Sequence, residues 1–174
     1  MKIKFRYIIF FVMFIAVVTR IAYVNLFYDK PVSYSNELGE KFAYGEQFEV
    51  SVDSIDTFSK DEWHEKLKND NVQMQDAAKD FIVILAECTV KNTGETEAKF
   101  DNSCVYAQIS SARNGGYMYA GNEKQVTPVY SPGQEKVIKM MYIIDKMGIA
   151  EKNILSEKAK VKVCEYSAIH TISQ

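Results

Sequence analysis

The chain has few of the residues that usually identify a catalytic or metal site. Its 174 residues include two histidines, three cysteines, three prolines and one tryptophan. With only His64 and His170, a Cys/His zinc site would need ligands brought together over long range. The low proline content and 13% aromatic residues argue against a disordered stalk. We therefore expect an ordered domain that needs no metal or other cofactor.

Motifs of common hydrolases and nucleotide-binding proteins are also missing. The sequence has no Gly-x-Ser-x-Gly elbow, no His-Glu-x-x-His pair, no glycine-rich phosphate loop and no EF-hand calcium loop. Asp53, Asp56 and Asp61 can hold calcium only if they converge, and solvated turn and cap carboxylates are the simpler interpretation. Ser103 and His170 leave an extracellular hydrolase as a third alternative. We expect a protein that is not an enzyme.

The chain does have one long apolar segment at its start. Lys2, Lys4 and Arg6 precede an apolar stretch over residues 7–28. As a helix this stretch is about 33 Å long, enough for a hydrocarbon core of roughly 30 Å. Arg20 lies in its outer half, where a long side chain can reach the headgroups. The basic residues predict a single-pass protein with a cytoplasmic N-terminus and an extracytoplasmic C-terminal domain.

Two interpretations of the segment stay open, an uncleaved signal anchor and a cleaved signal peptide. The best cleavage site, after Ala22, has Arg20 where a small residue is required. No cysteine near the stretch can serve as a lipoprotein attachment residue. We expect an uncleaved anchor over residues 1–28.

The rest of the chain is acidic. Without the four basic residues of the first 28 positions, 17 Lys and Arg face 23 Asp and Glu, a formal charge of −6. Such a surface repels phosphate backbones, so we expect no nucleic-acid partner. The length suits one domain and no more. We expect a linker over residues 29–46 and one domain over residues 47–174.

Short alternating segments between Gly and Asn turns predict a mainly β domain. Strands are expected at residues 47–58 with a bulge near Ser54, and at 81–91, 96–100, 105–109, 116–120, 127–130, 137–144 and 160–168. Ser59 and Glu62 form a capping box that predicts a short helix over residues 60–69. The segments 69–79 and 146–157 are expected to be a loop and an irregular crossing. Together these elements predict an antiparallel β-sandwich with one inserted helix.

The three cysteines cannot all pair within the chain. Cys88 shares a strand face with Ile84 and Val90, so we interpret it as a small buried hydrophobe. A Cys104–Cys164 bridge stays open, because the sequence does not show whether the two are neighbours.

Aromatic residues are the candidates for a partner surface. A glycine-rich hairpin is expected, with its turn at residues 114–116. Around it gather Tyr106, Tyr117, Tyr119 and Tyr130, and an exposed group of this kind suits a protein, peptide or glycan partner. The alternative is that these tyrosines cover sheet faces. Trp63 is either an aromatic anchor for a partner or a core residue that fixes the helix on the sheet, and we expect the second.

Several turn and core positions resemble a known pattern. They are Val83–Leu85, Val90–Gly94, Phe100, Gly116–Tyr117, Ser131–Gly133 and Val137. In these positions the chain resembles the immunoglobulin-like accessory domains of uncharacterised function on membrane-anchored proteins and lipoproteins of Gram-positive bacteria. The resemblance covers residues 47–168 and implies an immunoglobulin-like sandwich. It supplies no catalytic residues.

These observations favour binding over catalysis. We expect a membrane-tethered binding or accessory module of the cell envelope, held in the membrane by residues 7–28. The alternative is a structural or regulatory subunit of a membrane complex, which makes its contact through the transmembrane helix.

Overall fold

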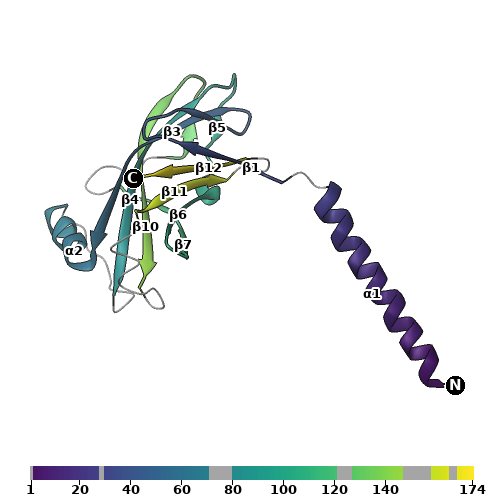
Figure 1. The fold of residues 1–174 in the computed structure, drawn as a ribbon. Coiled ribbons are helices and arrows are strands. Elements are labelled where there is room, and N and C mark those ends of the chain that lie inside the picture. Colours follow the sequence, from purple (N-terminus) through teal and green to yellow (C-terminus); the bar gives the residue numbers. More distant parts are fainter. Residues whose placement is uncertain (1, 28–29, 71–79, 121–126, 147–157, 165–167) are drawn as a thin grey trace. The chain divides into compact units, whose positions relative to one another are not determined.

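The computed structural model describes residues 2–27, 30–70, 80–120, 127–146, 158–164 and 168–174. Contacts divide the chain into two units, residues 1–32 and 33–174, and each is described by itself. Helix α1 (Lys2–Phe27) makes up most of the first unit (Figure 1). Its stretch Ile9–Leu26 contains one charged residue, Arg20. At about 27 Å, this stretch is long and apolar enough to cross a membrane.

Ten of the strands after α1 form two sheets. Sheet A has the order β1 (Val32–Asn36), β12 (Ala168–Ser173), β11 (Lys160–Cys164), β6 (Val105–Ile109) and β7 (Ala112–Gly115). Sheet B has the order β2 (Phe42–Tyr44), β3 (Phe48–Ser59), β4 (Phe81–Asn92), β10 (Glu135–Asp145) and β8 (Tyr117–Met118). A separate ribbon pairs β5 (Ala98–Lys99) with β9 (Val129–Tyr130), and a 3-10 turn, η1 (Asn102–Cys104), precedes β6.

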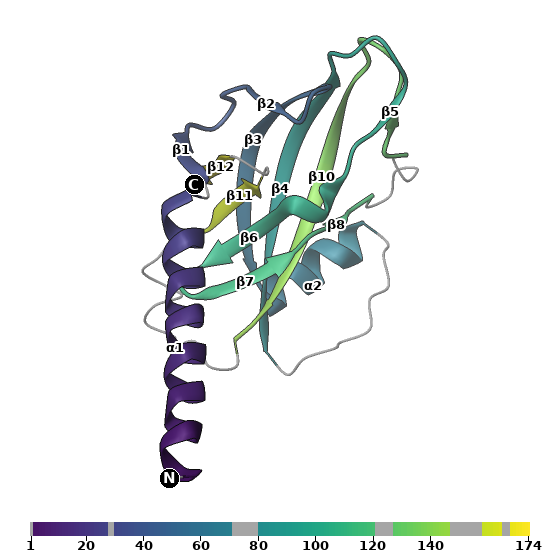
Figure 2. The same ribbon diagram turned by 90° about the vertical axis from the view of Figure 1, so that its right-hand side faces the viewer.

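The two sheets lie face to face, and helix α2 (Lys60–Asn69) covers the outer side of sheet B (Figures 1 and 2). Side chains alternate across each strand, so every second residue points into the space between the sheets. Val50 and Val52 of β3, and Val161 and Val163 of β11, are buried there in one common core. This mainly β, antiparallel architecture confirms the predicted fold class.

The predicted helix over residues 60–69 is confirmed as α2. The Ser59 side chain accepts a hydrogen bond from the Glu62 amide, and the Glu62 carboxylate accepts one from the Ser59 amide at 2.7 Å. These bonds satisfy amides that the first helical turn leaves without partners. Trp63 and Leu67 face the sheet and form a second apolar cluster with Phe81, Val83 and Leu85 of β4.

The longest strands lie in the middle of sheet B. β4 pairs with β3 on one side and with β10 on the other over nearly its whole length. The register of the β3–β4 pair shifts between Val52 and Ser54, which confirms the predicted bulge. β4 is apolar on both faces at its start because the core covers one face and α2 covers the other.

The predicted turn at residues 114–116 is wrong. The chain reverses earlier, at Ser110 with a φ of 53°, so that residues 112–115 form β7 and pair with β6. At Gly116 the chain then crosses from sheet A to sheet B. A Cβ at this position would lie 2.5 Å from a ring carbon of Tyr142, so a side chain would collide with the core. Gly116 therefore allows the backbone to pass close to Tyr142, whereas the turn itself lies at Ser110.

Two other predictions about strands differ from the structure. The segment 160–168 was expected to be one final strand, but β11 and β12 are separate antiparallel strands of sheet A. Residues 29–46, expected to be a linker, contain β1 and β2, which lie at the edges of sheets A and B. Both edge strands are short, and β1 is mostly exposed, so neither shows the long apolar alternation typical of a core strand. The predictions for 71–79 and 147–157 lie outside the described residues.

Candidate binding surfaces

The five aromatic residues considered as candidates for a partner surface differ in exposure and do not form one exposed group. Tyr117 of β8 is exposed to 64%, and Tyr106 of β6 is half-buried on the outer face of sheet A. Tyr130 and Trp63 are completely buried, one in the main core and the other under α2. Burial raises the pKa of Tyr130 to about 12. Trp63 is thus the expected core residue, and Tyr130 also belongs to the interior.

Tyr119 connects the end of sheet B to α2. Its ring lies 5.3 Å from the Trp63 ring, and its hydroxyl donates a hydrogen bond of 2.7 Å to Oδ2 of Asp70. Burial, followed by the bond to Asp70, raises the pKa of Tyr119. The tyrosine is therefore a structural tie between two elements.

Substitutions should separate the roles of the two neighbouring tyrosines. Tyr119→Ala should lower the free energy of unfolding by about 2–3 kcal/mol, because it removes a packed ring and a hydrogen bond. Tyr117→Ala should change it by less than about 0.5 kcal/mol, since the side chain is exposed. Urea unfolding of the full chain in detergent measures both values. Equal losses for the two variants would contradict these assignments.

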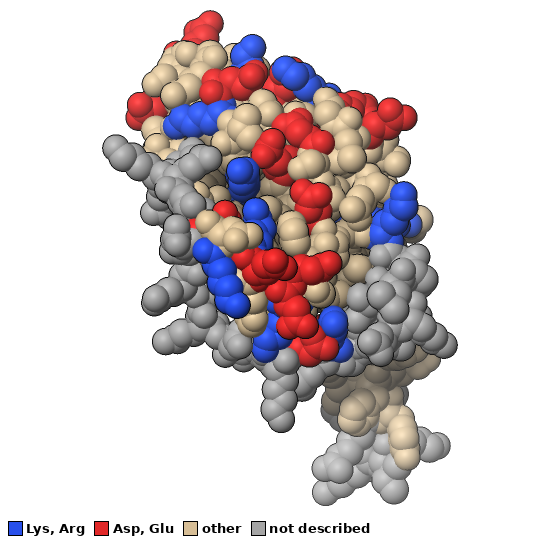
Figure 3. Space-filling model, turned by 90° about the vertical axis from the view of Figure 1, so that its left-hand side faces the viewer, with Lys and Arg blue, Asp and Glu red and all other residues tan. Residues whose placement is uncertain are grey.

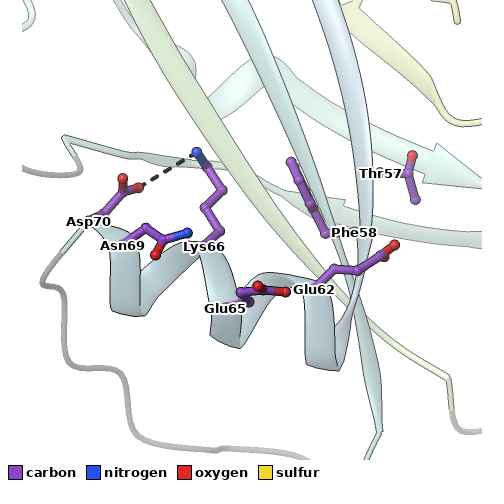
Figure 4. A pocket seen from close by; sticks show the side chains of 7 residues that line it. All are labelled: Thr57, Phe58, Glu62, Glu65, Lys66, Asn69 and Asp70. Atoms are coloured by element: carbon purple, nitrogen blue, oxygen red, sulfur yellow. Dashed lines mark ion pairs between the residues drawn. The ribbon is translucent and has the colours of Figure 1, made fainter.

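A hollow of about 430 Å³ lies between α2 and the end of β3 (Figure 4). Its lining residues are Thr57, Phe58, Glu62, Glu65, Lys66, Asn69 and Asp70. Glu62 caps the helix, and its bonds from Ser59 lower the pKa of its carboxyl. Asp70 accepts the Tyr119 bond and pairs with Lys66 at 3.7 Å. Two of the three carboxylates thus stabilise α2, which makes the hollow a poor cation site.

The three aspartates considered as calcium ligands have three different surroundings. Asp53, at the bulge of β3, accepts hydrogen bonds from Ser51 at 2.7 Å and Thr89 at 2.6 Å. Asp61 lies in the first turn of α2 and Asp56 is exposed on β3. Within the described residues, no group of three or more His, Cys, Asp or Glu side chains is placed to hold a metal ion.

Ser103 and His170 have different surroundings. The His170 ring is stacked on Phe42 at 4.2 Å and on Tyr34 at 5.0 Å, and its Nδ1 lies 2.9 Å from Oδ1 of Asn36. Ser103 is exposed in η1, where its amide donates to Asp101. The described contacts do not bring the pair together, and His170 instead ties the edge strands β1 and β2 to β12.

All three cysteines are free thiols in this structure. Cys88 is buried in the main core, as predicted, and burial raises its pKa to about 12. Cys104 is exposed in η1, and Cys164 is half-exposed at the end of β11.

The outer face of sheet A has a charge pattern that the sequence analysis missed. Within their described bounds, the five strands of this sheet contain no Asp or Glu, but they contain Arg113, Lys160 and Lys162. The Arg113 guanidinium lies over the Tyr106 ring at 5.8 Å, and Lys162 is the cross-strand partner of Tyr106. In the part of the chain that the structure describes, no carboxylate pairs with these three cations. We call this group the cationic face.

Sheet B has the opposite balance. Its acidic residues are Glu49, Asp53, Asp56, Glu87, Glu135 and Asp145, against Lys91, Lys136 and Lys139. Figure 3 shows acidic and basic side chains intermixed on the side of α2. The negative charge of the domain is therefore distributed unevenly. Arg113 and Lys162 are almost 50 positions apart, so only the pairing of β7, β6 and β11 reveals the cationic face.

No family model matches the chain, and a search of curated proteins finds no match. Solved structures resemble its fold. An uncharacterised β-sandwich protein from Clostridium difficile is 10% identical with a TM-score of 0.50, over 84% of this chain and 99% of that one. A secreted protein from Mycobacterium tuberculosis is 11% identical with a TM-score of 0.50, over 83% and 98%. At such low identity, the likeness shows the β-sandwich fold alone.

Proposed function

We propose that the chain is a single-pass, membrane-tethered module with an immunoglobulin-like extracytoplasmic domain. It acts by binding a polyanionic partner in the cell envelope through the cationic face, and it performs no catalysis. The observation that carries this proposal is the separation of charge. Three cations share one sheet face without a neighbouring carboxylate of the same sheet, although the domain has a formal charge of −6.

The expected affinity follows from these charges. A basic side chain near an anionic surface contributes about 1 kcal/mol, so the three cations contribute about 3 kcal/mol. This attraction is screened by salt, because the side chains are at least partly exposed. Tethering raises the local concentration of the domain, so weak binding of this kind is sufficient.

Charge reversal tests the binding surface. Inorganic polyphosphate is the probe, and the full chain is held in nanodiscs of zwitterionic lipid. The double variant Lys160→Glu/Lys162→Glu should weaken binding at least tenfold at about 0.1 M salt, because it replaces two attractive charges by repulsive ones. Calorimetry or fluorescence of labelled polyphosphate measures the change.

A matched variant controls for net charge. Lys68→Glu/Lys99→Glu makes the same change at exposed positions of α2 and β5. It should leave binding within about twofold at about 0.1 M salt, because charges separated by more than a Debye length of about 10 Å are largely screened there. Equal weakening by both double variants would mean that net charge alone decides binding and would reject the cationic face.

The tether has its own test. The mass of the protein extracted from membranes should correspond to the intact chain with residues 1–28, and a protease added outside the cell should reach the sandwich. Loss of the first 20 to 30 residues, about the length of a signal peptide, would replace the anchor by a secreted domain.

Arg20 supports a second candidate function. A charged residue inside an apolar span commonly faces a partner helix. The chain would then be a structural or regulatory subunit that contacts a membrane complex through α1. Replacing α1 by an unrelated anchor should abolish capture of that complex, whereas polyphosphate binding should persist.

A further inference from the structure

Cys164 is the last residue of β11, and Cys104 is the last residue of η1, directly before β6, the strand that neighbours β11 in sheet A. β6 and β11 are antiparallel, and the last pairs of their register are Lys162 with Tyr106 and Val163 with Val105. The two cysteines are the residues that come next beyond this last pair, Cys164 at the end of β11 and Cys104 at the end of η1. Val105, which follows Cys104, has an extended backbone with a φ of −103°.

Both thiols lie outside the core. Val163 is buried, so alternation along β11 points Cys164 outward, and Cys104 at the end of η1 is exposed. Tyr106 is on this outer face, and its pKa is raised by burial and then by a hydrogen bond with Cys164. Facing residues of antiparallel strands have Cα atoms about 4.5–5.5 Å apart, which overlaps the roughly 4.4–6.8 Å that disulfides require.

The third cysteine is placed differently. Cys88 is 3% exposed in the main core, and its cross-strand partners are Val52 and Ile138. Its thiol is therefore neither reachable from solvent nor opposite another cysteine. The three cysteines are therefore one buried thiol in the core and two thiols outside it, at the neighbouring ends of η1 and β11.

We propose that Cys104 and Cys164 form an intramolecular disulfide that staples β6 to β11 beside the cationic face. The inference rests on the proposed extracytoplasmic location, which supplies an oxidising environment. The oxidant is an external disulfide. One cysteine thiolate attacks it and releases a thiolate, and the second cysteine thiolate then attacks the mixed disulfide and releases another. The two protons that the cysteines lose are taken up, through solvent, by the two released thiolates, so the external disulfide is reduced to two thiols.

The first experiment maps the thiols of the protein as it exists in cells. Membranes that contain the full chain are treated with N-ethylmaleimide, and the protein is digested without reduction. A peptide that links Cys104 to Cys164 is expected by mass spectrometry, together with Cys88 that is alkylated only after denaturation. Cys88→Ser should keep this peptide, whereas Cys104→Ser and Cys164→Ser should each remove it.

A second experiment tests whether the two cysteines are placed to react with each other, independently of the compartment in which the domain lies. The purified, reduced full chain in detergent is given oxidised glutathione. Rapid formation of the Cys104–Cys164 link in this experiment supports the inference. If the link forms here but the thiols in cells are free, the inferred geometry stands and the extracytoplasmic location is rejected. Failure to form the link, pairing through Cys88, or disulfide-linked dimers would overturn the inference.

The link should also change thermal stability. A loop of this length predicts that reduction lowers Tm by roughly 10 °C in the native chain. The same reductant should leave Tm of Cys104→Ser unchanged. An unchanged Tm of the native chain, when the linked peptide is present, would show that the bond does not staple the strands.

Discussion

Asn92→Ala is expected to lower the free energy of unfolding by about 3–4 kcal/mol, because it removes three hydrogen bonds of a buried side chain, one of them to the carbonyl oxygen of the buried Tyr130. The side chain of Asn92 is completely buried at the end of β4. Its Nδ2 donates to the carbonyl oxygens of Thr96 at 2.8 Å and Tyr130 at 3.0 Å, and its Oδ1 accepts from the Gly94 amide at 2.9 Å. One amide thus joins β4, the following turn and the β5–β9 ribbon.

Chemical denaturation of the full chain in detergent measures this loss, and two further variants interpret it. Thr93→Ala changes the exposed neighbouring side chain and should shift stability by less than about 0.5 kcal/mol. Asn92→Asp keeps the shape but replaces the donor by a carboxylate beside two carbonyl oxygens, so it should be about as harmful as alanine. A small effect of both Asn92 variants would show that water replaces the side chain easily.

Trp63→Ala should lower the free energy of unfolding by about 3–5 kcal/mol, because it empties the space between α2 and sheet B. The Trp63 ring is completely buried and lies 5.6 Å from Phe58 and 5.3 Å from Tyr119. Leu67 is the other buried residue of α2. Without the indole, the helix has little apolar surface left to keep it on the sheet.

Circular dichroism measures this change, since the variant lacks the single tryptophan whose fluorescence otherwise reports unfolding. Lys68→Ala, at an exposed position of the same helix, should have almost no effect. Trp63→Phe should lose less than half as much as Trp63→Ala, because Nε1 has no hydrogen-bond partner within the described part of the chain. A loss below about 1 kcal/mol for Trp63→Ala would restore the interpretation of Trp63 as a partner anchor.

Local signals in the sequence predicted the elements that form mainly by local interactions. The capping box of Ser59 and Glu62 lies within four residues, so it identified α2 at its observed bounds. The alternation in β3 likewise indicated a strand buried on one face, and the continuous apolar start of β4 indicated burial on both faces. The bulge at Val52 and Ser54 was visible because it interrupts that alternation.

The errors arose where a residue type has more than one structural use. Glycine at position 116 was interpreted as a turn residue, but it allows the chain to pass close to the Tyr142 ring. Strands β1 and β2 resembled a linker because edge strands need few apolar residues when the neighbouring strand supplies most of the pairing. The tyrosines near the hairpin were grouped by sequence distance, yet Tyr130 lies inside the core and Tyr117 outside it.

By itself, the sequence determined the apolar N-terminal segment, the acidic charge of the remainder and the β-rich class, since composition and short-range periodicity carry these properties. Only the tertiary structure decided which side chains share a surface. Arg113 shares a face with Lys160 and Lys162, and Cys104 and Cys164 come to neighbouring positions at the ends of η1 and β11, because strands far apart in the chain pair in one register. Register depends on the packing of both sheets against a common core, and no local pattern records it.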